Sequence, residues 1–204
     1  MTGRILPSTL EDVTLVADLR EQDGSARSGA NLTRVHGESA IPETGQPIER
    51  VFLRPEGARA YPDAVRAILE ADIVIAGPGS LFTSVLPNLL VRDIQRAVEA
   101  SSAQRIYICN VATQPGETDG FDVGQHMDAI ERHVGKGLFR LVLANRELFQ
   151  SPDHPETEMV PLQYPADSSY EVLTADLVDL GMPSRHDSRK LASQILAIYH
   201  NHPA

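Results

Sequence analysis

The stretch ADIVIAGPGSLFTSVLPNLLV, residues 71–91, decides the fold. Its apolar run over residues 72–76 is typical of a buried strand, the tetrapeptide GPGS at residues 77–80 breaks that run, and a helical apolar pattern follows. A strand, a tight turn and a helix in this order form the repeating unit of α/β folds with parallel sheets. The stretch therefore predicts an α/β fold, with a rigid turn at the end of a core strand.

The same order of elements recurs downstream. Residues 105–109 and 138–143 are predicted strands, and helices are predicted over residues 88–100 and 123–134. Strands that alternate with helices are joined by right-handed crossovers into a parallel sheet. Residues 61–147 are therefore predicted to form a parallel βαβ core.

The segment before this core has a different pattern. Short extended pieces occur at residues 13–17, 31–35 and 48–53, separated by turn signals such as DGSARSG at residues 23–29. Short strands divided by Gly, Pro and Asp are typical of hairpins. Residues 1–60 are therefore predicted to form a small antiparallel β appendage.

Two segments follow the core. Residues 148–183 are rich in Pro, Asp and Ser, which predicts a loop with at most an edge strand near residues 159–162. Residues 184–204 are predicted to form a C-terminal helix, with Asp187 or Ser188 as its cap. We expect the 204 residues to form a single α/β domain.

Composition and charge argue against several classes of protein. With 18 basic and 28 acidic residues, the formal net charge is -10, which disfavours nucleic acid or an anionic membrane as main partner but allows a local basic pocket. The single cysteine, Cys109, cannot form an internal disulfide, and no apolar segment approaches the length of a membrane span. The start of the sequence lacks the apolar centre of a signal peptide. These features predict a soluble cytoplasmic protein.

The GPGS turn is the first candidate binding element. Gly77 and Gly79 allow a ligand to approach the backbone closely, Pro78 restricts the loop, and Ser80 adds a hydroxyl. Backbone N–H groups at the start of the following helix favour an anion such as a phosphate. The alternative is that these residues only form a tight turn. The turn has neither the Lys-Ser/Thr pair of a P-loop nor the spacing of a dinucleotide fingerprint.

Polar side chains follow the next predicted strand. Asn110 comes directly after it, and the loop VATQPGETDG then supplies five more, those of Thr113, Gln114, Glu117, Thr118 and Asp119. Because ligands of open α/β sheets bind beyond the carboxyl ends of the strands, the loop at residues 111–120 and the GPGS turn are expected to face one crevice. Asn145, after the third strand, is expected at the same rim. The alternative is an ordinary solvated loop, which also favours such residues.

Two long motifs, GPGSLFTSVLPNLLV and CNVATQPGETDGFDVGQH, resemble the gluconeogenesis factor family of bacteria. That family is related to the CofD-like 2-phospho-L-lactate transferases of deazaflavin cofactor synthesis. The resemblance extends to LPST, GESAIP and IERVFLRP upstream and to SRHDSRKLASQIL near the end. It implies a Rossmann-like fold of which this chain matches the C-terminal part. The Gly-rich N-terminal half of the family has no counterpart here, so we expect the chain to be a fragment of a longer family member.

The resemblance also implies a function. On the gluconeogenesis-factor branch the ligand is a nucleotide sugar of the UDP-N-acetylglucosamine type, and the role is regulatory, supporting growth on gluconeogenic carbon sources and normal cell shape and wall synthesis. This branch does not imply an enzyme, and we favour it on the wording of the motifs. The alternative is a magnesium-dependent transferase that moves a phospholactyl group from a guanosine diphosphate adduct to a deazaflavin alcohol. A third possibility is an inactive truncated remnant.

The residues that match the family's motifs are carried over as candidate ligand contacts, namely Gly77, Pro78, Gly79, Ser80, Asn88, Asn110, Gln114, Glu117 and Thr118. Backbone groups of Gly79, Ser80 and Leu81 are expected near a diphosphate, and the amides of Asn110 and Gln114 near the sugar or base. Arg185, in SRHDS, is the candidate cation for the phosphates.

No catalytic residue and no metal ligand is assigned. His126 and His133 share a predicted helix face, but two histidines without a third ligand are usually surface residues. Magnesium is implied only for the full-length transferase branch. The expected partners are a nucleotide sugar and either a second copy of the chain or the missing N-terminal half, because a sheet without several strands would leave an apolar edge uncovered.

Overall fold

The structure is a computed structural model that describes residues 3–20, 32–146 and 155–201. The predicted hairpin turn at residues 23–29 lies outside these ranges, as do residues 148–154 of the predicted loop and the last three residues of the chain. Within the described ranges, no helix has the length and the apolar character needed to cross a bilayer.

The apolar runs of the core form a four-stranded parallel sheet. In spatial order its strands are β4 (Ile73–Ala76), β5 (Gln104–Ile108), β6 (Leu141–Asn145) and β7 (Glu171–Ala175). The two central strands are the most buried, as expected where other elements cover both faces of a parallel sheet. This arrangement confirms the predicted α/β fold class.

The N-terminal appendage is a separate three-stranded antiparallel sheet, which is also as predicted. In spatial order its strands are β2 (Leu32–His36), β1 (Thr14–Arg20) and β3 (Ile48–Arg54). Because successive side chains of a strand point to opposite faces, Leu15, Ala17 and Leu19 of β1 join the main core. Asp18 lies on the other face, where it contacts arginines of both neighbouring strands.

The prediction for the edge of the parallel sheet is wrong in its position. Near residues 159–162, Met159 makes only an isolated bridge with Ala112, and the edge strand is β7 instead. The sequence of β7, EVLTA, is half polar, because Glu171 and Thr174 are exposed at the edge of the sheet. A short strand of this kind lacks the apolar run by which β4 and β5 are recognised in the sequence.

Helices α2 (Pro62–Leu69) and α5 (Val123–Val134) start where their capping chemistry places them. Helix α2 begins at Pro62, where the missing N–H of proline costs no helical hydrogen bond. Helix α5 begins with a capping box. In this box the N–H of Gln125 donates to Asp122 Oδ1 at 2.7 Å, and the N–H of Asp122 donates to Gln125 Oε1 at 2.9 Å.

The last helix, α6 (Ser188–Asn201), resolves the choice between two predicted caps. Asp187 Oδ1 accepts the N–H groups of Arg189 at 2.8 Å and of Lys190 at 3.0 Å. Asp187 is therefore the cap, and it fixes the direction in which the preceding loop enters the helix.

Where the sequence predicts one helix over residues 88–100, the structure has three helical pieces between residues 81 and 100. They are a π-helical turn η1 (Leu81–Val85), the short helix α3 (Leu86–Leu89) and helix α4 (Arg92–Ala100). The helical path thus starts directly after the GPGS turn, and it is interrupted at Val91, whose backbone is extended. A further short helix, α1 (Ala40–Glu43), was not predicted, because a single turn carries no readable periodicity.

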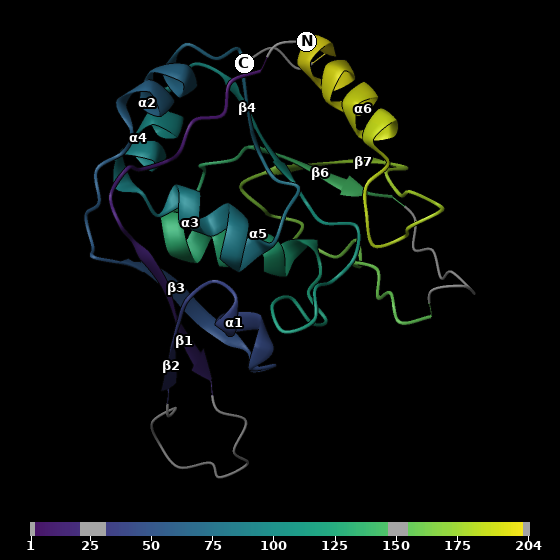
Figure 1. The fold of residues 1–204 in the computed structure, drawn as a ribbon. Coiled ribbons are helices and arrows are strands. Elements are labelled where there is room, and N and C mark those ends of the chain that lie inside the picture. The colour runs from purple at the N-terminus through teal and green to yellow at the C-terminus, as the bar shows by residue number, and fades with distance from the viewer. Residues whose placement is uncertain (1–2, 21–31, 147–154, 202–204) are drawn as a thin grey trace.

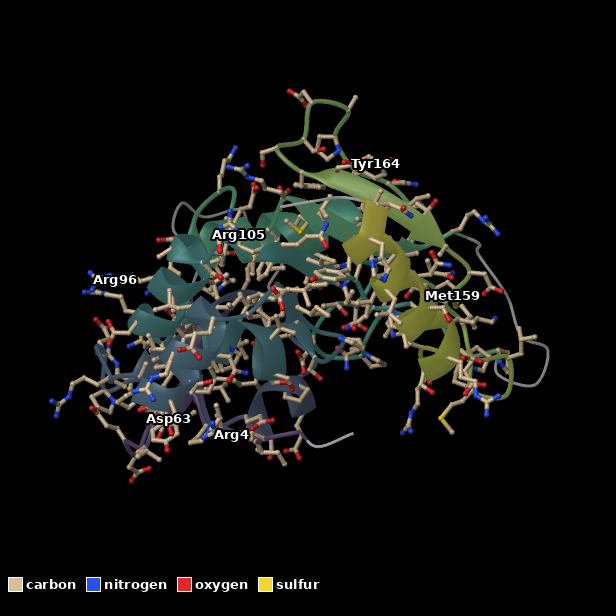
Figure 2. The ribbon with its side chains drawn as sticks, turned by 90° about the horizontal axis from the view of Figure 1, so that it is seen from above. Arg4, Asp63, Arg96, Arg105, Met159 and Tyr164 are labelled. Atoms are coloured by element: carbon tan, nitrogen blue, oxygen red, sulfur yellow. The ribbon has the colours of Figure 1, made fainter. Side chains whose placement is uncertain are left out.

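The elements stack in layers around the parallel sheet, as Figure 1 shows. One face of the sheet packs on α6, where Ile106, Leu143 and Met159 cluster with Ile198. Figure 2 shows Met159 beside this helix. The other face contributes Tyr107 and Val142 to the larger core, which also contains residues of η1, α3, α4, α5 and the antiparallel sheet. The carboxyl ends of the central strands are left for the loops that build the candidate site.

His133 joins α5 to the edge of the antiparallel sheet. Its Nδ1–H donates to the carbonyl oxygen of Ala129 at 2.6 Å, and its Nε2 accepts the N–H of Val51 at 2.9 Å. The ring is therefore neutral, with the proton on Nδ1. Burial lowers the pKa of His133, and the positive charges of Arg132 and Arg50 lower it further, against the opposing effect of the Ala129 carbonyl.

This lowered pKa predicts a loss of stability in mild acid. Below about pH 6.5 the unfolded chain binds a proton at this side chain that the folded chain excludes, so the free energy of unfolding falls as the pH falls. We expect His133 to contribute a loss of at most about 1.4 kcal/mol between pH 7.5 and 5.5, the limit set by the unfolded-state pKa, measured by urea denaturation. The variant His133→Gln, whose amide oxygen can accept the Val51 N–H, should have a smaller pH dependence. An unchanged pH dependence would contradict this account.

Candidate functional site

The GPGS turn lies where β4 ends against the end of β5. Gly77 has a φ of +86°, and a Cβ atom there would lie 2.8 Å from the carbonyl oxygen of Ile108. Both the left-handed backbone and the close approach therefore require glycine at this position. The two loops that follow β4 and β5 are held side by side by this contact.

Asn110 and Gln114 connect the second loop to the GPGS turn. Asn110 Nδ2 donates to the carbonyl oxygen of Gly79 and to Gln114 Oε1, both at 3.1 Å, and Asn110 Oδ1 accepts the N–H of Gly79 at 3.4 Å. Gln114 Nε2 donates in turn to Ser80 Oγ at 2.9 Å. The two predicted loops therefore meet, and their polar side chains form one hydrogen-bonded network.

Glu117 points inward rather than into solvent. It is 8% exposed, and its carboxylate accepts the Phe82 N–H at 3.1 Å and the Thr83 hydroxyl at 2.7 Å. These donors belong to η1, at the start of the helical path after the GPGS turn. The carboxylate of Glu117 thus lies at the start of the helical path after the GPGS turn, where the sequence predicts the anion of a ligand.

The second loop is held against α1. Gly116 has a φ of +78°, and a Cβ atom there would lie 2.1 Å from the carbonyl oxygen of Pro42. The N–H of Gly116 donates to Asp119 Oδ2 at 2.7 Å, and the N–H of Gln114 donates to the buried Thr118 Oγ1 at 2.9 Å. The loop is therefore tightly folded, and it can form one wall of a site.

A hollow of about 760 Å³ lies between these loops and the segment before α6. We call it the GPGS hollow. Its walls include Pro78, Gly79, Asn110, Thr113, Gln114 and Arg185. Three segments far apart in the sequence thus supply its polar groups.

The segment before α6 is folded back so that Arg185 reaches this hollow. The N–H of Asp179 donates to the carbonyl oxygen of Arg185 at 3.0 Å, and His186 Nε2–H donates to the carbonyl oxygen of Cys109 at 3.2 Å. Arg185 itself is exposed, and within the described part of the chain its guanidinium has no hydrogen-bond or ion-pair partner. A free guanidinium at the rim of a polar hollow is suited to an anionic ligand.

Two titratable groups beside the hollow are held in their neutral forms. Burial lowers the pKa of His186, and the hydrogen bond to the Cys109 carbonyl only partly opposes this. Burial likewise raises the pKa of the Cys109 thiol, so this cysteine is a packed side chain and not a nucleophile. His186 was missed as a site residue from the sequence, although it adjoins Arg185 in the quoted motif SRHDS.

Some predicted site residues lie elsewhere. Asn88 and Gly77 line a second, more apolar hollow of about 500 Å³, and Pro78 and Gly79 lie between it and the GPGS hollow. The remaining predicted residues support the scaffold. Leu81 and Thr118 are fully buried. Asn145 is also buried, and its Oδ1 accepts the N–H of Leu177 at 3.0 Å.

The described residues supply no cluster of three protein ligands for the magnesium ion of the transferase branch. In the three described ranges, no group of three His, Cys, Asp or Glu side chains converges as metal ligands would. Glu117, an acidic residue that lines the GPGS hollow, directs its carboxylate to η1. The carboxylate of Glu117 is therefore not turned toward a cation in this hollow.

Comparison with known proteins gives one family match. A sequence model of the family described as 2-phospho-L-lactate transferase CofD matches residues 1–178 of the chain. The gluconeogenesis factor of Listeria innocua is 39% identical over 209 residues, which cover 98% of this chain and 60% of the relative. The gluconeogenesis factor of Bacillus subtilis is 38% identical over 203 residues, which cover 95% of this chain and 61% of the relative.

Solved structures agree with the sequence relatives. A crystal structure of a UPF0052 family member from Bacillus halodurans superposes with a TM-score of 0.81 at 35% identity, covering 95% of this chain and 62% of that chain. The chain thus spans about three fifths of the length of these relatives.

Proposed function

The chain belongs to the 2-phospho-L-lactate transferase CofD family, and because its relatives include gluconeogenesis factors, we propose that it is a regulatory protein of the gluconeogenesis-factor type that binds a UDP-sugar. UDP-N-acetylglucosamine is the ligand we favour. The protein would act in the cytoplasm and support growth on gluconeogenic carbon sources and normal cell shape. The observation that carries the proposal is that the Arg185 guanidinium, which has no partner among the described residues, shares one hollow with the Asn110 and Gln114 amides.

The proposal assigns a part of the ligand to each wall of the GPGS hollow. Arg185 would hold the diphosphate, because a guanidinium matches phosphate oxygens with paired N–H donors. The carboxylate of Glu117 at the start of η1 would repel the phosphates, so they would lie on the Arg185 side of the hollow. The amides of Asn110 and Gln114 would then face the sugar or the base. The volume of about 760 Å³ lies within the usual range of small-molecule sites.

The variant Arg185→Gln tests this assignment. A charged hydrogen bond to phosphate contributes about 1.5–3 kcal/mol, so we expect the variant to weaken UDP-N-acetylglucosamine binding by roughly 10- to 100-fold in a calorimetric titration. Arg185→Lys should retain part of the affinity, because it keeps the charge but loses the bidentate geometry. The control is Arg189→Gln, an exposed arginine of α6 that does not line the hollow. Equal affinities for the wild type and Arg185→Gln would contradict the assigned role.

The transferase remains a second candidate because the matching family description names that activity over residues 1–178. Titration with guanosine diphosphate and uridine diphosphate separates the two candidates. Preference for the uridine nucleotide supports the UDP-sugar proposal, and preference for the guanosine nucleotide supports the transferase. A folded chain that binds neither nucleotide would favour the third reading, a chain without a working site.

A further inference from the structure

A second cationic hollow lies on the antiparallel sheet. Its volume is about 320 Å³, and its walls include Arg34, Arg50, Phe52, Arg54, Leu90 and Arg132. We call it the arginine hollow. It shares no lining residue with the GPGS hollow, and the proposed function does not use it.

Three of its arginines are gathered on one aromatic ring. The guanidinium carbons of Arg34, Arg50 and Arg54 lie 5.0, 5.5 and 5.1 Å from the centroid of the Phe52 ring. Residues 50, 52 and 54 share one face of β3 because strand side chains alternate, and Arg34 comes from β2. Each contact with the ring contributes about 0.5–1 kcal/mol, which offsets part of the repulsion between like charges. The ring thus concentrates positive charge in a chain of net charge -10.

Among the described residues, the carboxylates at this surface are fewer than the guanidinium groups. Arg34 Nε and an Arg50 terminal nitrogen each lie 2.7 Å from the carboxylate of the same residue, Asp18, which is 2% exposed. The hydrogen bond from Arg34 is the largest cause that holds the pKa of Asp18 below its usual value. One carboxylate therefore serves two arginines, and an unbalanced positive charge remains.

The other two arginines are still less neutralised. Arg54 lies 3.1 Å from Glu56, whose side chain is 71% exposed, so water screens this pair strongly. Arg132 Nε donates to the main-chain oxygen of Asp128 at 3.2 Å, and within the described residues no carboxylate pairs with it. Glu49 and Glu56 also line the hollow, and Glu49 is engaged by Arg20.

Unused donors therefore converge on a small space. A guanidinium has five N–H donors in a planar fork, and the contacts above use only part of them. The side chains of Arg34, Arg50 and Arg54 are 47%, 60% and 50% exposed, so their free edges are accessible to a ligand. Phosphate oxygens match this donor geometry in pairs.

We propose that the arginine hollow binds a small phosphate-bearing anion, of the size of pyrophosphate or a phosphate monoester. A volume of about 320 Å³ is at the lower end of ligand sites and suits an anion of this size. Nucleic acid is a poor occupant, because the strongly acidic remainder of the chain would repel an extended phosphate backbone. Leu90 and His133 close the inner side of the site.

The test is a calorimetric titration of inorganic pyrophosphate into the whole chain and into two variants, Arg54→Gln and Arg132→Gln. Both substitutions leave the Asp18 pairs intact, so no buried charge loses its partner. We expect the wild type to bind and each variant to lose affinity by about tenfold, since a charged hydrogen bond is worth at least about 1.5 kcal/mol. Binding should also weaken as the salt concentration rises.

Two control variants separate this inference from the proposed function. Arg96→Gln removes an exposed arginine of α4 that lines neither hollow, and Arg185→Gln removes the cation of the GPGS hollow. Arg96→Gln should bind pyrophosphate as the wild type does, whereas Arg185→Gln should lose only the binding that belongs to the GPGS hollow and keep the binding that Arg54→Gln and Arg132→Gln weaken. Absence of pyrophosphate binding by the folded wild type at millimolar concentration would overturn the inference. Loss of binding in Arg185→Gln alone would overturn it too, because the anion would then occupy the GPGS hollow.

Discussion

Replacing Gly116 by alanine is expected to lower the free energy of unfolding by about 3 kcal/mol. About 1–2 kcal/mol comes from placing a Cβ atom on a backbone with positive φ, and the remainder comes from steric overlap. The new Cβ would lie 2.1 Å from the carbonyl oxygen of Pro42, so α1 and the loop must separate. For a chain of this size the midpoint of thermal unfolding should fall by roughly 6–12 °C.

Gly120 offers a matched control in the same loop. Its φ is +69°, but a Cβ atom there would meet nothing within 4 Å. Gly120→Ala should therefore show only the backbone cost of about 1–2 kcal/mol. Chemical denaturation of the two variants separates the overlap with Pro42 from the effect of φ. If Gly116→Ala were no less stable than Gly120→Ala, the close packing of α1 on this loop would be wrong.

The sequence predicts the elements whose signals are local. β5 is buried on both faces and ends within the apolar run IYIC at residues 106–109, and the caps of α5 and α6 are short polar motifs directly before the helices. β7 could not be found in the same way. Its few residues form a strand because they pair with β6, and that pairing depends on the sheet and not on their own pattern.

The candidate site also has some features that the sequence predicts and others that it does not. That the GPGS turn and the second loop meet follows from topology, because both lie at the carboxyl ends of adjacent parallel strands. The position of Arg185 does not follow from its spacing, since it depends on a bridge between Val178 and His186 that folds the segment back. The inward direction of Glu117 was equally hidden, because a carboxylate in a polar loop normally points to water.

Glu117 joins the second loop to η1 through two buried hydrogen bonds. Replacing it by alanine would leave the Phe82 N–H and the Thr83 hydroxyl buried without the acceptor that they share. Losing a charged acceptor and stranding a buried donor together cost about 3 kcal/mol or more. We therefore expect Glu117→Ala to be among the most destabilising single substitutions at the site, with faster hydrogen exchange at the Phe82 amide.

Glu117→Gln is the matched variant that separates shape from charge. Its amide oxygen can accept the Phe82 N–H, and its NH₂ group can donate to the Thr83 oxygen once that hydroxyl has turned. The loss should then be only about 1 kcal/mol, the difference between a charged and a neutral hydrogen bond. In a Thr83→Val background the hydroxyl is absent, so the NH₂ group introduced by Glu117→Gln finds no acceptor there, and the substitution should cost more. A coupling energy near zero in this double-mutant cycle would show that the carboxylate does not bind the two donors as a unit. The hydrogen bonds between the GPGS turn and the second loop would then be those of Asn110 and Gln114 alone.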